Sequence, residues 1–519
     1  MIDYIIVQAG GKGTRLGYLT KNKPKALVPV DNLPMLFHLF RKYPQKRFVI
    51  IADYKKDVLR KYLSAFCDVK YQVVDAIGTG TCSGVGQALD LIPDHEPFML
   101  IWSDLILPEK LELPEGYRDE DSKDHITSDY VGLSSTFPCR WKYENGEFAE
   151  ERSVEYGVAG FFLFREKEII SDVPESGELV RWMRDKDLKF DTVSLAGTRE
   201  FGILEEYEKL ASIKTRPFNR IRTEGNVLIK EPVDEQGREL AAKERAWYEK
   251  VRDLKIKGIP EIYDTNPLKM ELIRGRNIYD CELPFEEKKK VLQALVGTLK
   301  ELHSKESVPA DSFSMKEAYF NKTMKRLAKV EDLVPYAKER FITVNGRKCR
   351  NVFFYKGELE ERLDKIRSER FPLIHGDCTF SNLMIKDDGT PILIDPRGYF
   401  GFTKLYGDER YDWAKLYYSI VGNYDRFNLK KFKLVIGGHS IVDGSIIPDL
   451  QEGEVKIEIE SNGWEDMEQA FFDLTGADEY EIKLLHAVIW LSLTTYAWQD
   501  YDSVCGSFYN GLYYLEEVL

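Results

Sequence analysis

The chain has 519 residues, of which 43% are hydrophobic and 31% charged, and its formal net charge is −13. This length exceeds what one hydrophobic core usually covers, so we expect more than one domain, and the composition is typical of folded protein. The acidic balance disfavours a nucleic-acid partner, because binding to a phosphate backbone requires a basic surface. We therefore expect small-molecule substrates.

The sequence also bears on location. No apolar stretch approaches the roughly 20 residues needed to span a bilayer, and the opening residues MIDYIIVQAGG lack the basic region of a secretory signal. Seven cysteines are scattered without CxxC spacing, which favours reduced thiols. We expect a cytoplasmic protein without membrane insertion.

Short apolar runs alternate with helical patterns over residues 1–212, which we assign to a first domain. The predicted strands are Tyr4–Gln8, Phe48–Ala52, Lys70–Val74, Phe98–Trp102 and Gly160–Phe164, and the predicted helices include Met35–Tyr43 and Lys56–Phe66. Several of these strands are unbroken by polar residues, as in buried parallel sheets. The pattern predicts an α/β sandwich with a mostly parallel sheet.

The alternation of short apolar runs with helical patterns changes after the predicted helix Leu204–Ser212. We therefore assign residues 213–519 to a second domain. Its first part, about 213–275, is predicted to be a small lobe with strands Asn226–Lys230 and Leu268–Ile273 and the helix Gly237–Arg252. Long amphipathic helices then dominate a large lobe, about 276–519. Within it, Lys433–Ser461 is rich in Gly, Val and Ile and is predicted to be a β-rich insertion.

A glycine-rich turn follows the first strand and contains Gly10, Gly11, Gly13 and Thr14. Such a turn lets backbone N–H groups approach a phosphate closely. It is not a dinucleotide fingerprint, because Leu16 stands at the third glycine position, nor a Walker A loop, because Gly13 follows Lys12. Arg15 and Lys25 would place two cations against a triphosphate.

This turn, together with Lys23-Pro24-Lys25, resembles the signature of sugar-phosphate and phosphocholine nucleotidyltransferases over roughly the first 210 residues. The resemblance implies a Rossmann-like α/β sandwich in which Arg15 and Lys25 are catalytic. It also implies that Gly80 and Thr81 lie near the base and ribose of the nucleotide, although Gly/Thr/Ser segments are also common as ordinary turns.

Two carboxylates are candidate ligands for Mg²⁺, which binds carboxylates together with phosphate oxygens. Asp104 follows the strand Phe98–Trp102, at the carboxyl end where α/β sheets bind ligands; its other interpretation is a helix cap. The resemblance implies a second metal-binding Asp, and Glu200 takes its place in this sequence.

A second motif has the order that kinase chemistry requires. An Asp must orient and deprotonate the acceptor hydroxyl, and an Asn and a second Asp must hold metal ions. Asp377, Asn382 and Asp395 supply this order, the first two within the stretch His375-Gly-Asp-Cys-Thr-Phe-Ser-Asn382. We interpret His375 as a residue that fixes the loop by packing and hydrogen bonding.

This stretch resembles the loop of aminoglycoside phosphotransferases and choline kinases, relatives of protein kinases, over roughly residues 213–519. The resemblance implies a two-lobed, protein-kinase-like α+β domain. Lys230 would bind ATP phosphates with Glu244 as its helical ion-pair partner, and Glu271 and Ile273 would meet adenine. Asp412 is expected to be a structural buttress.

The acceptor side departs from choline kinases, which follow the metal-binding Asp with a sequence different from Pro396–Gly401. Five aromatic residues are candidates for a cage around a quaternary amine or, alternatively, for the core: Trp413, Tyr417, Trp490, Tyr496 and Trp498.

Together the two motifs predict a bifunctional, Mg²⁺-dependent enzyme. It would phosphorylate a small alcohol with ATP and couple the phosphate to an NTP, with CTP expected, to give an activated precursor for surface polysaccharide while releasing pyrophosphate. One alternative is an anomeric sugar kinase joined to a sugar-1-phosphate nucleotidyltransferase. Another is that one domain is a non-catalytic regulatory or binding module.

Overall fold

The computed structural model describes residues 2–118, 126–202, 204, 207, 219–232, 235–280, 282–438, 441, 442, 445, 446 and 450–519. The chain divides into two compact units, residues 1–215 with 499–501 and residues 216–498 with 502–519. The domain boundary expected after residue 212, and most of the helix expected over Leu204–Ser212, lie outside the described residues. Within the described ranges, no helix is long and apolar enough to cross a membrane.

The first unit is built on a nine-stranded sheet with the path β10-β9-β11-β6-β1-β4-β5, in which β8 pairs with β11 and β12 with β8. All five strands predicted from the sequence are present. The strands are β1 Tyr4–Gln8, β4 Arg47–Ala52, β5 Lys70–Asp75, β6 Phe98–Trp102, β8 Tyr130–Ser134, β9 Lys142–Glu144, β10 Glu147–Ala149, β11 Gly157–Phe164 and β12 Asp191–Ser194.

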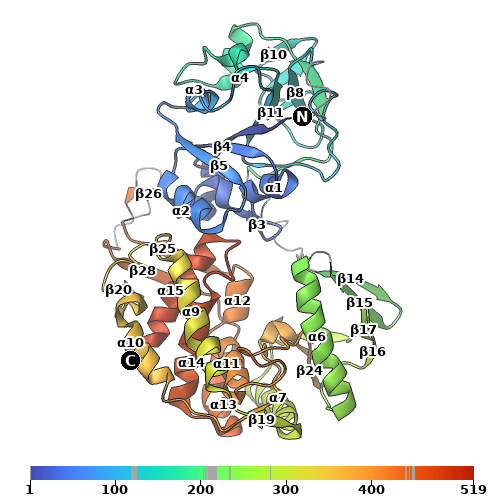
Figure 1. The fold of residues 1–519 in the computed structure, drawn as a ribbon, viewed down its shortest axis with the longest axis vertical. Helices are drawn as coiled ribbons and strands as arrows, with labels where there is room; N and C mark the ends of the chain where they lie inside the picture. The colour runs from blue at the N-terminus through green and yellow to red at the C-terminus, as the bar shows by residue number, and fades with distance from the viewer. Residues whose placement is uncertain are drawn as a thin grey trace. The chain divides into compact units, whose positions relative to one another are not determined.

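Helices cover both faces of this sheet (Figure 1). Val49 and Ile51 of β4 share a core cluster with Val85 of α3 (Val85–Leu89). Phe48, the neighbouring residue on β4, meets Phe40 of α1 (Met35–Lys42), with ring centroids 4.7 Å apart. Because successive strand residues point to opposite faces, α1 and α3 cover opposite sides. The predicted α/β sandwich is confirmed.

The direction of the strands differs in part from the prediction. The strands β1, β4, β5 and β6 are parallel, but β11 is antiparallel to both β6 and β8. The sheet is therefore mixed. All eight residues of β11 are buried, and an unbroken apolar run fits a central strand of either direction, so this segment carried no signal of its orientation.

The small lobe of the second unit is an antiparallel sheet with the order β14-β15-β17-β16, packed against α6 (Figure 1). Trp247 and Tyr248 of α6 are fully buried in the core of the unit. The elements are β14 Asn219–Glu224, β15 Val227–Pro232, α6 Glu235–Leu254, β16 Ile262–Thr265 and β17 Leu268–Glu271. The elements β15, β17 and α6 correspond to the predicted strands and helix, whereas β14 and β16 were not predicted.

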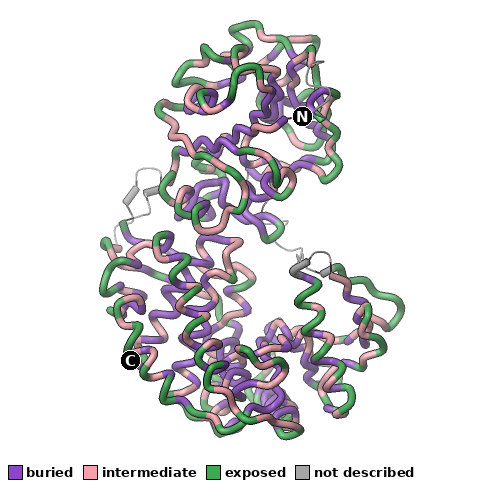
Figure 2. The backbone as a smooth tube through the Cα atoms, in the orientation of Figure 1, coloured by how far each residue is buried: buried purple, intermediate pink, exposed green. Residues whose placement is uncertain are grey.

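The large lobe is mainly helical. A small sheet has the order β18-β23-β24, and its strands β23 and β24 lie between Asn382 and Asp395 of the predicted kinase site. Figure 2 colours the backbone of this lobe by burial. The main elements are β18 Gly275–Asn277, α7 Phe285–Lys305, α9 Lys322–Val330, α10 Val352–Leu363, β23 Leu383–Lys386, β24 Pro391–Leu393, α11 Glu409–Ile420, α14 Glu479–Leu493 and α15 Tyr501–Leu515. The predicted two-lobed α+β domain is confirmed.

The stretch 433–461 is β-rich, as predicted. Its strands β25 (Phe432–Ile436) and β28 (Glu454–Ile459) are antiparallel. β28 also pairs in parallel with β20 (Phe341–Val344), which forms a hairpin with β21 (Arg347–Arg350). The stretch therefore completes a four-stranded sheet with an earlier hairpin of the large lobe.

Gly160 of β11 allows a close approach that generates the first prediction. It has a φ of +82°, and a Cβ there would lie 2.0 Å from the Trp102 ring. Gly160→Ala should lower the free energy of unfolding of the first unit by about 3 kcal/mol, because left-handed backbone strain and overpacking add. Gly146→Ala is the matched control, since Gly146 has a φ of +81° with open space around it. Equal losses in calorimetric unfolding would show that the contact with Trp102 is unimportant.

Candidate active sites

The glycine-rich turn after β1 is built by close backbone packing. A Cβ on Gly10 would lie 2.7 Å from the Asp53 Cβ, and one on Gly13, whose φ is +63°, would lie 3.1 Å from the Lys25 side chain. A Cβ on Gly11 would meet nothing within 4 Å. The turn continues into a short helix, Thr14–Thr20. The backbone beside Gly11 is therefore open to a ligand such as a phosphate.

The structure brings Asp104, Lys25 and Glu200 together. Asp104 follows β6, and its Oδ2 accepts a hydrogen bond from Lys25 Nζ. Just beyond it, β7 (Leu105–Ile106) pairs with β13 (Arg199–Glu200), with Glu200 opposite Leu105. This two-stranded pairing places Glu200 close to Asp104, the other predicted Mg²⁺ ligand.

The two carboxylates form a donor set of the kind that Mg²⁺ binds. Asp104 Oδ1 is buried and has no hydrogen-bond partner among the described residues. Burial and the charge of Asp104 raise the pKa of Glu200, against the opposing effect of Lys25 and Arg15. Two like charges in a buried place repel one another, and a cation between them would remove that repulsion.

Arg15 lies beside the same carboxylates. Its guanidinium is 3.3 Å from the place that a Cβ on Gly202 would occupy, next to the Glu200 carboxylate. Its side chain is exposed, so it borders the site from the solvent side. The two predicted cations, Lys25 and Arg15, are thus within the electrostatic reach of Glu200.

Gly80 and Thr81 lie near the end of β1. Gln8, the last residue of that strand, donates through Nε2 to the Thr81 carbonyl, and the Leu179 N–H donates to Thr81 Oγ1 at 2.7 Å. A Cβ on Gly80, whose φ is +79°, would lie 2.3 Å from the Gly177 carbonyl oxygen. The segment is a tightly packed turn beside the carboxyl end of the sheet.

In the second unit, Lys230 contacts two other predicted site residues. Its Nζ donates to both Glu244 oxygens, at 2.9 and 2.8 Å, and to Asp395 Oδ1 at 2.9 Å. Burial works to lower the pKa of Lys230, but Asp395 and Glu244 outweigh it and raise the pKa. Asp395 has a φ of 53°, in the left-handed region, and strained backbone of this kind clusters at functional sites.

Asp377 and Asn382 lie together in the predicted loop. Asn382 Nδ2 donates to the Asp377 carbonyl at 2.9 Å and to Asp377 Oδ2 at 3.0 Å. Lys415 of α11 forms an ion pair with Asp377 Oδ1 at 2.9 Å. Burial works to raise the pKa of Asp377, but Lys415 and Arg397 outweigh it and hold the pKa below its ordinary value. The carboxylate therefore stays ionised.

A buried carboxylate supports this loop. Asp412 is 0% exposed and accepts hydrogen bonds from the backbone N–H groups of His375 and Gly376, at 2.9 and 2.6 Å, and from His303 Nε2 at 2.9 Å. Burial lowers the pKa of His375, and its Nε2 lies 3.1 Å from the Ile394 carbonyl. Asp412 is a structural buttress, and His375 packs and hydrogen-bonds within the loop.

The remaining predicted positions lie at the edges of this site. Glu271 ends β17, and its side chain accepts from Lys386 Nζ at 2.7 Å, while Ile273 is buried. Of the five aromatic candidates for an amine cage, Trp413, Tyr417 and Trp490 are at most 4% exposed and belong to the core. Those side chains therefore do not form a cage.

Four cations near Asp377 were missing from the predicted site, and the sequence carried a signal for only two of them, Lys415 and Arg397. Lys415 is three residues after Asp412, so both project from one face of α11. Arg397 stands in the stretch noted as a departure from choline kinases. Lys322 and Arg326 are four residues apart on α9, but only the fold brings that helix to the site.

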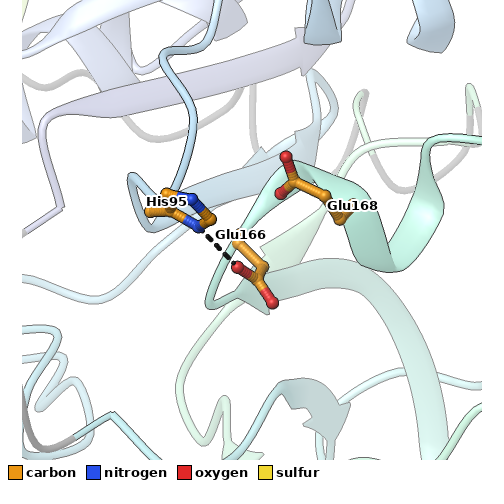
Figure 3. A group of neighbouring side chains, drawn as sticks. All are labelled: His95, Glu166 and Glu168. Carbon is orange, nitrogen blue, oxygen red and sulfur yellow. Dashed lines mark hydrogen bonds and ion pairs between the residues drawn. The ribbon is translucent and has the colours of Figure 1, made fainter.

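A further group of ligand-type side chains lies elsewhere in the first unit (Figure 3). Among the described residues, His95, Glu166 and Glu168 are the one set of three whose donor atoms could share a cation. His95 Nδ1 is 3.0 Å from Glu166 Oε2, and the His95 side chain is 81% exposed. Exposed acidic groups of this kind are common without a metal, and none of the predicted site residues belongs to the set.

Comparisons with known proteins divide the chain in the same way. Residues 5–112 match the MobA-like NTP transferase domain, and residues 220–426 match the phosphotransferase enzyme family. The chain therefore carries a nucleotidyltransferase domain followed by a phosphotransferase domain, as the two motifs predicted.

Individual relatives match the first part. A bifunctional protein GlmU of Methanocaldococcus jannaschii is 31% identical over 21% of this chain and 26% of its own length. The UTP–glucose-1-phosphate uridylyltransferase AglF of Haloferax volcanii is 34% identical over 20% of this chain and 45% of its own length. The chain thus spans less than half of each. The crystal structure of HddC from Yersinia pseudotuberculosis has a TM-score of 0.33 and 19% identity, over 40% of this chain and 98% of that one.

The buried carboxylate of Asp412, which supports the loop, generates the second prediction. Asp412→Asn should lower the free energy of unfolding of the second unit by about 3 kcal/mol, because the amide cannot accept all three hydrogen bonds and a buried donor is left unpaired. Urea denaturation measures this loss. Asp473→Asn is the control, because Asp473 is an exposed carboxylate of the same unit, and it should change stability by less than about 0.5 kcal/mol. Equal stability of the two variants would contradict the role given to Asp412.

Proposed function

Because the chain joins a nucleotidyltransferase domain to a phosphotransferase domain, we propose that it catalyses two successive reactions. The second unit phosphorylates a small alcohol with ATP, and the first couples the resulting phosphate to an NTP, with CTP expected, and releases pyrophosphate. The product is a nucleotide-diphospho precursor for surface polysaccharide, made in the cytoplasm where both nucleotides are available. The observation that carries the proposal is that one chain contains both the Lys230–Glu244–Asp395 cluster beside Asp377 and the Lys25–Asp104–Glu200 cluster.

In the kinase reaction, Asp377 accepts a hydrogen bond from the acceptor hydroxyl and takes its proton as the bond to phosphorus forms. Its lowered pKa and its ion pair with Lys415 keep it in the ionised form that this role requires. Lys230 binds ATP phosphates. Asn382 and Asp395 hold Mg²⁺; Asn382 donates through its amide nitrogen to Asp377, which leaves its oxygen for the ion. Glu271 and Ile273 lie where adenine would meet the backbone.

In the nucleotidyl transfer, the glycine-rich turn with Gly10, Gly11, Gly13 and Thr14 binds the triphosphate, while Arg15 and Lys25 neutralise its charge. Asp104 and Glu200 hold Mg²⁺, which the unpartnered Asp104 oxygen and the raised pKa of Glu200 support. Bound there, the ion would offset charge on the α-phosphate. Gly80 and Thr81 line the nucleoside side.

A second candidate is an anomeric sugar kinase joined to a sugar-1-phosphate nucleotidyltransferase. It is favoured by the curated relatives of the first domain, which include the uridylyltransferase of Haloferax volcanii and a mannose-1-phosphate guanylyltransferase subunit of Dictyostelium discoideum. A matrix of nucleoside triphosphates against alcohols, sugars and their phosphates, with ADP and pyrophosphate measured separately, distinguishes the two. Pyrophosphate released only with sugar 1-phosphates would favour the second candidate.

Asp377→Asn is the third prediction. It should lower ADP release by about a hundredfold to ten-thousandfold, because the hydroxyl loses the group that orients and deprotonates it. ATP affinity should stay near that of the wild type, since Lys230 and its partners are untouched. Pyrophosphate release from the prepared alcohol phosphate is the internal control and should be unchanged. A variant that phosphorylates normally would remove Asp377 from the site.

Glu200→Gln is the fourth prediction. It should reduce pyrophosphate release and raise the Mg²⁺ concentration required, because one of two carboxylate ligands is lost. Asp104→Asn provides the reference for loss of the other, and Glu200→Asp should also impair the reaction because the shorter side chain falls about one methylene short of the ion. ADP release serves as the control. Unchanged activity with an unchanged Mg²⁺ requirement would leave Asp104 as the only carboxylate ligand.

A further inference from the structure

A group of cations gathers on the Asp377 side of the second unit's site. Its members are Lys322 and Arg326 of α9, Arg397 in the loop after Asp395, and Lys415 of α11. Lys415 is paired with Asp377. Among the residues that the structure describes, the other three form no ion pair with any carboxylate. The site therefore holds more positive than negative charge.

Neutral groups hold these three cations in place. Arg397 donates to the hydroxyls of Tyr411 and, at 2.7 Å, Tyr399, and its guanidinium carbon lies 4.3 Å from the centre of the Tyr399 ring. Lys322 Nζ lies 5.8 Å from the centre of the Tyr411 ring. Arg326 donates to the Ser492 carbonyl at 2.6 Å and to its hydroxyl at 3.0 Å. Each contact orients a charge without neutralising it.

The arrangement is electrostatically unfavourable as it stands. Burial lowers the pKa of Lys322 well below its ordinary value, and Arg397, Arg326 and Lys415 lower it further, against a smaller opposing effect of Glu317. Burial and Arg397 likewise lower the pKa of Arg326. A π-helical turn, Glu317–Asn321, immediately precedes α9, an irregularity that is frequent at functional sites. The three side chains are half-buried, and unpaired charges that repel one another there are costly; a bound anion would remove that cost.

The position of the cations assigns that anion to the acceptor rather than to ATP. Burial aside, the groups that act on Lys230, the proposed ATP-phosphate residue, are Asp395 and Glu244. Those that act on Asp377, the group facing the acceptor hydroxyl, are Lys415, Arg397 and His375. The Arg397 N–H donates to the His375 carbonyl at 2.9 Å, and Lys322 and Arg397 both contact Tyr411. Arg326 lies one turn after Lys322 on α9. The three unpaired cations are therefore grouped with the loop that carries Asp377.

We propose that the alcohol phosphorylated by the second unit carries a negative charge of its own, a carboxylate or phosphate group that Lys322, Arg326 and Arg397 bind while the hydroxyl meets Asp377. This inference rests on the proposed kinase activity. The hydroxyl oxygen attacks the γ-phosphorus, the bond to the ADP oxygen breaks, and the proton passes to Asp377. A quaternary amine is disfavoured in this place, because its positive charge would face Lys322, Arg326 and Arg397.

Steady-state ADP release by the full chain tests the charge of the acceptor. The alcohols are glycerate and glycerol 3-phosphate, which are anionic, glycerol, which is neutral, and choline, which is cationic, with gluconate and glucitol as a longer matched pair. The two glycerol derivatives separate a carboxylate from a phosphate acceptor. We expect kcat/KM for the anionic member of a pair to exceed that of the neutral one by about tenfold or more.

The variant Lys322→Met tests whether Lys322 binds the negative charge of the acceptor. Lys325→Met is the matched control, because Lys325 lies on the exposed side of the same helix. We expect Lys322→Met to raise KM for the anionic alcohol by roughly tenfold to a hundredfold, with KM for ATP unchanged. Its thermal stability should stay the same or rise, because a repelling charge is removed; a merely structural lysine would lower it. Lys325→Met should match the wild type.

Calorimetric titration with inorganic phosphate, in the presence of a non-hydrolysable ATP analogue and Mg²⁺, gives a readout that does not require turnover. Tenfold or greater weakening of phosphate binding in Lys322→Met, but not in Lys325→Met, supports the anion site even if no alcohol in the panel is phosphorylated, in which case it is the proposed kinase activity that fails. A preference for glycerol or choline would overturn the inference and leave the kinase proposal standing. The same conclusion would follow if Lys322→Met changed neither the phosphate affinity nor the KM for the alcohol.

Discussion

The kinase-like site depends on one buried carboxylate. Asp412 receives the backbone N–H groups of His375 and Gly376 and the ring of His303, so the start of the loop that carries Asp377 is fixed to α11. One turn further along the same helix, Lys415 pairs with Asp377 itself. A single rigid helix therefore holds both the backbone and the charged end of this loop, which is the preorganisation that phosphoryl transfer requires.

The two units manage charge in different ways. In the second, Lys230 compensates Glu244 and Asp395 directly. In the first, Lys25 compensates Asp104 while Glu200 remains beside it with a raised pKa. The first site sets the two cations Lys25 and Arg15 against two carboxylates, whereas the acceptor side of the second is short of negative charge. That deficit matches the anionic alcohol proposed for it.

Much of the fold could be predicted from the sequence because its strands are short, apolar and bounded by turns. The Asp377, Asn382 and Asp395 set was also readable, since its spacing follows from the mechanism. The antiparallel direction of β11 was not, because a fully buried strand has no polar face to mark its partner. The cation group was missed because Lys322, Arg397 and Lys415 lie on three separate elements, which only tertiary packing brings to one place. The choice between an amine cage and the core was open for the aromatic residues, because their helical spacing does not distinguish a core from a pocket; Trp413, Tyr417 and Trp490 belong to the core.

The most direct test of the account is to follow one phosphorus atom through both sites. The full chain is incubated with ATP labelled at the γ-phosphate, unlabelled CTP, Mg²⁺ and the alcohol that the second unit accepts, and the products are separated by chromatography. The account predicts label first in the alcohol phosphate and then in a cytidine-diphospho conjugate, with one pyrophosphate released for each conjugate formed. Label that stays in the alcohol phosphate when every NTP is supplied would contradict the coupled reaction.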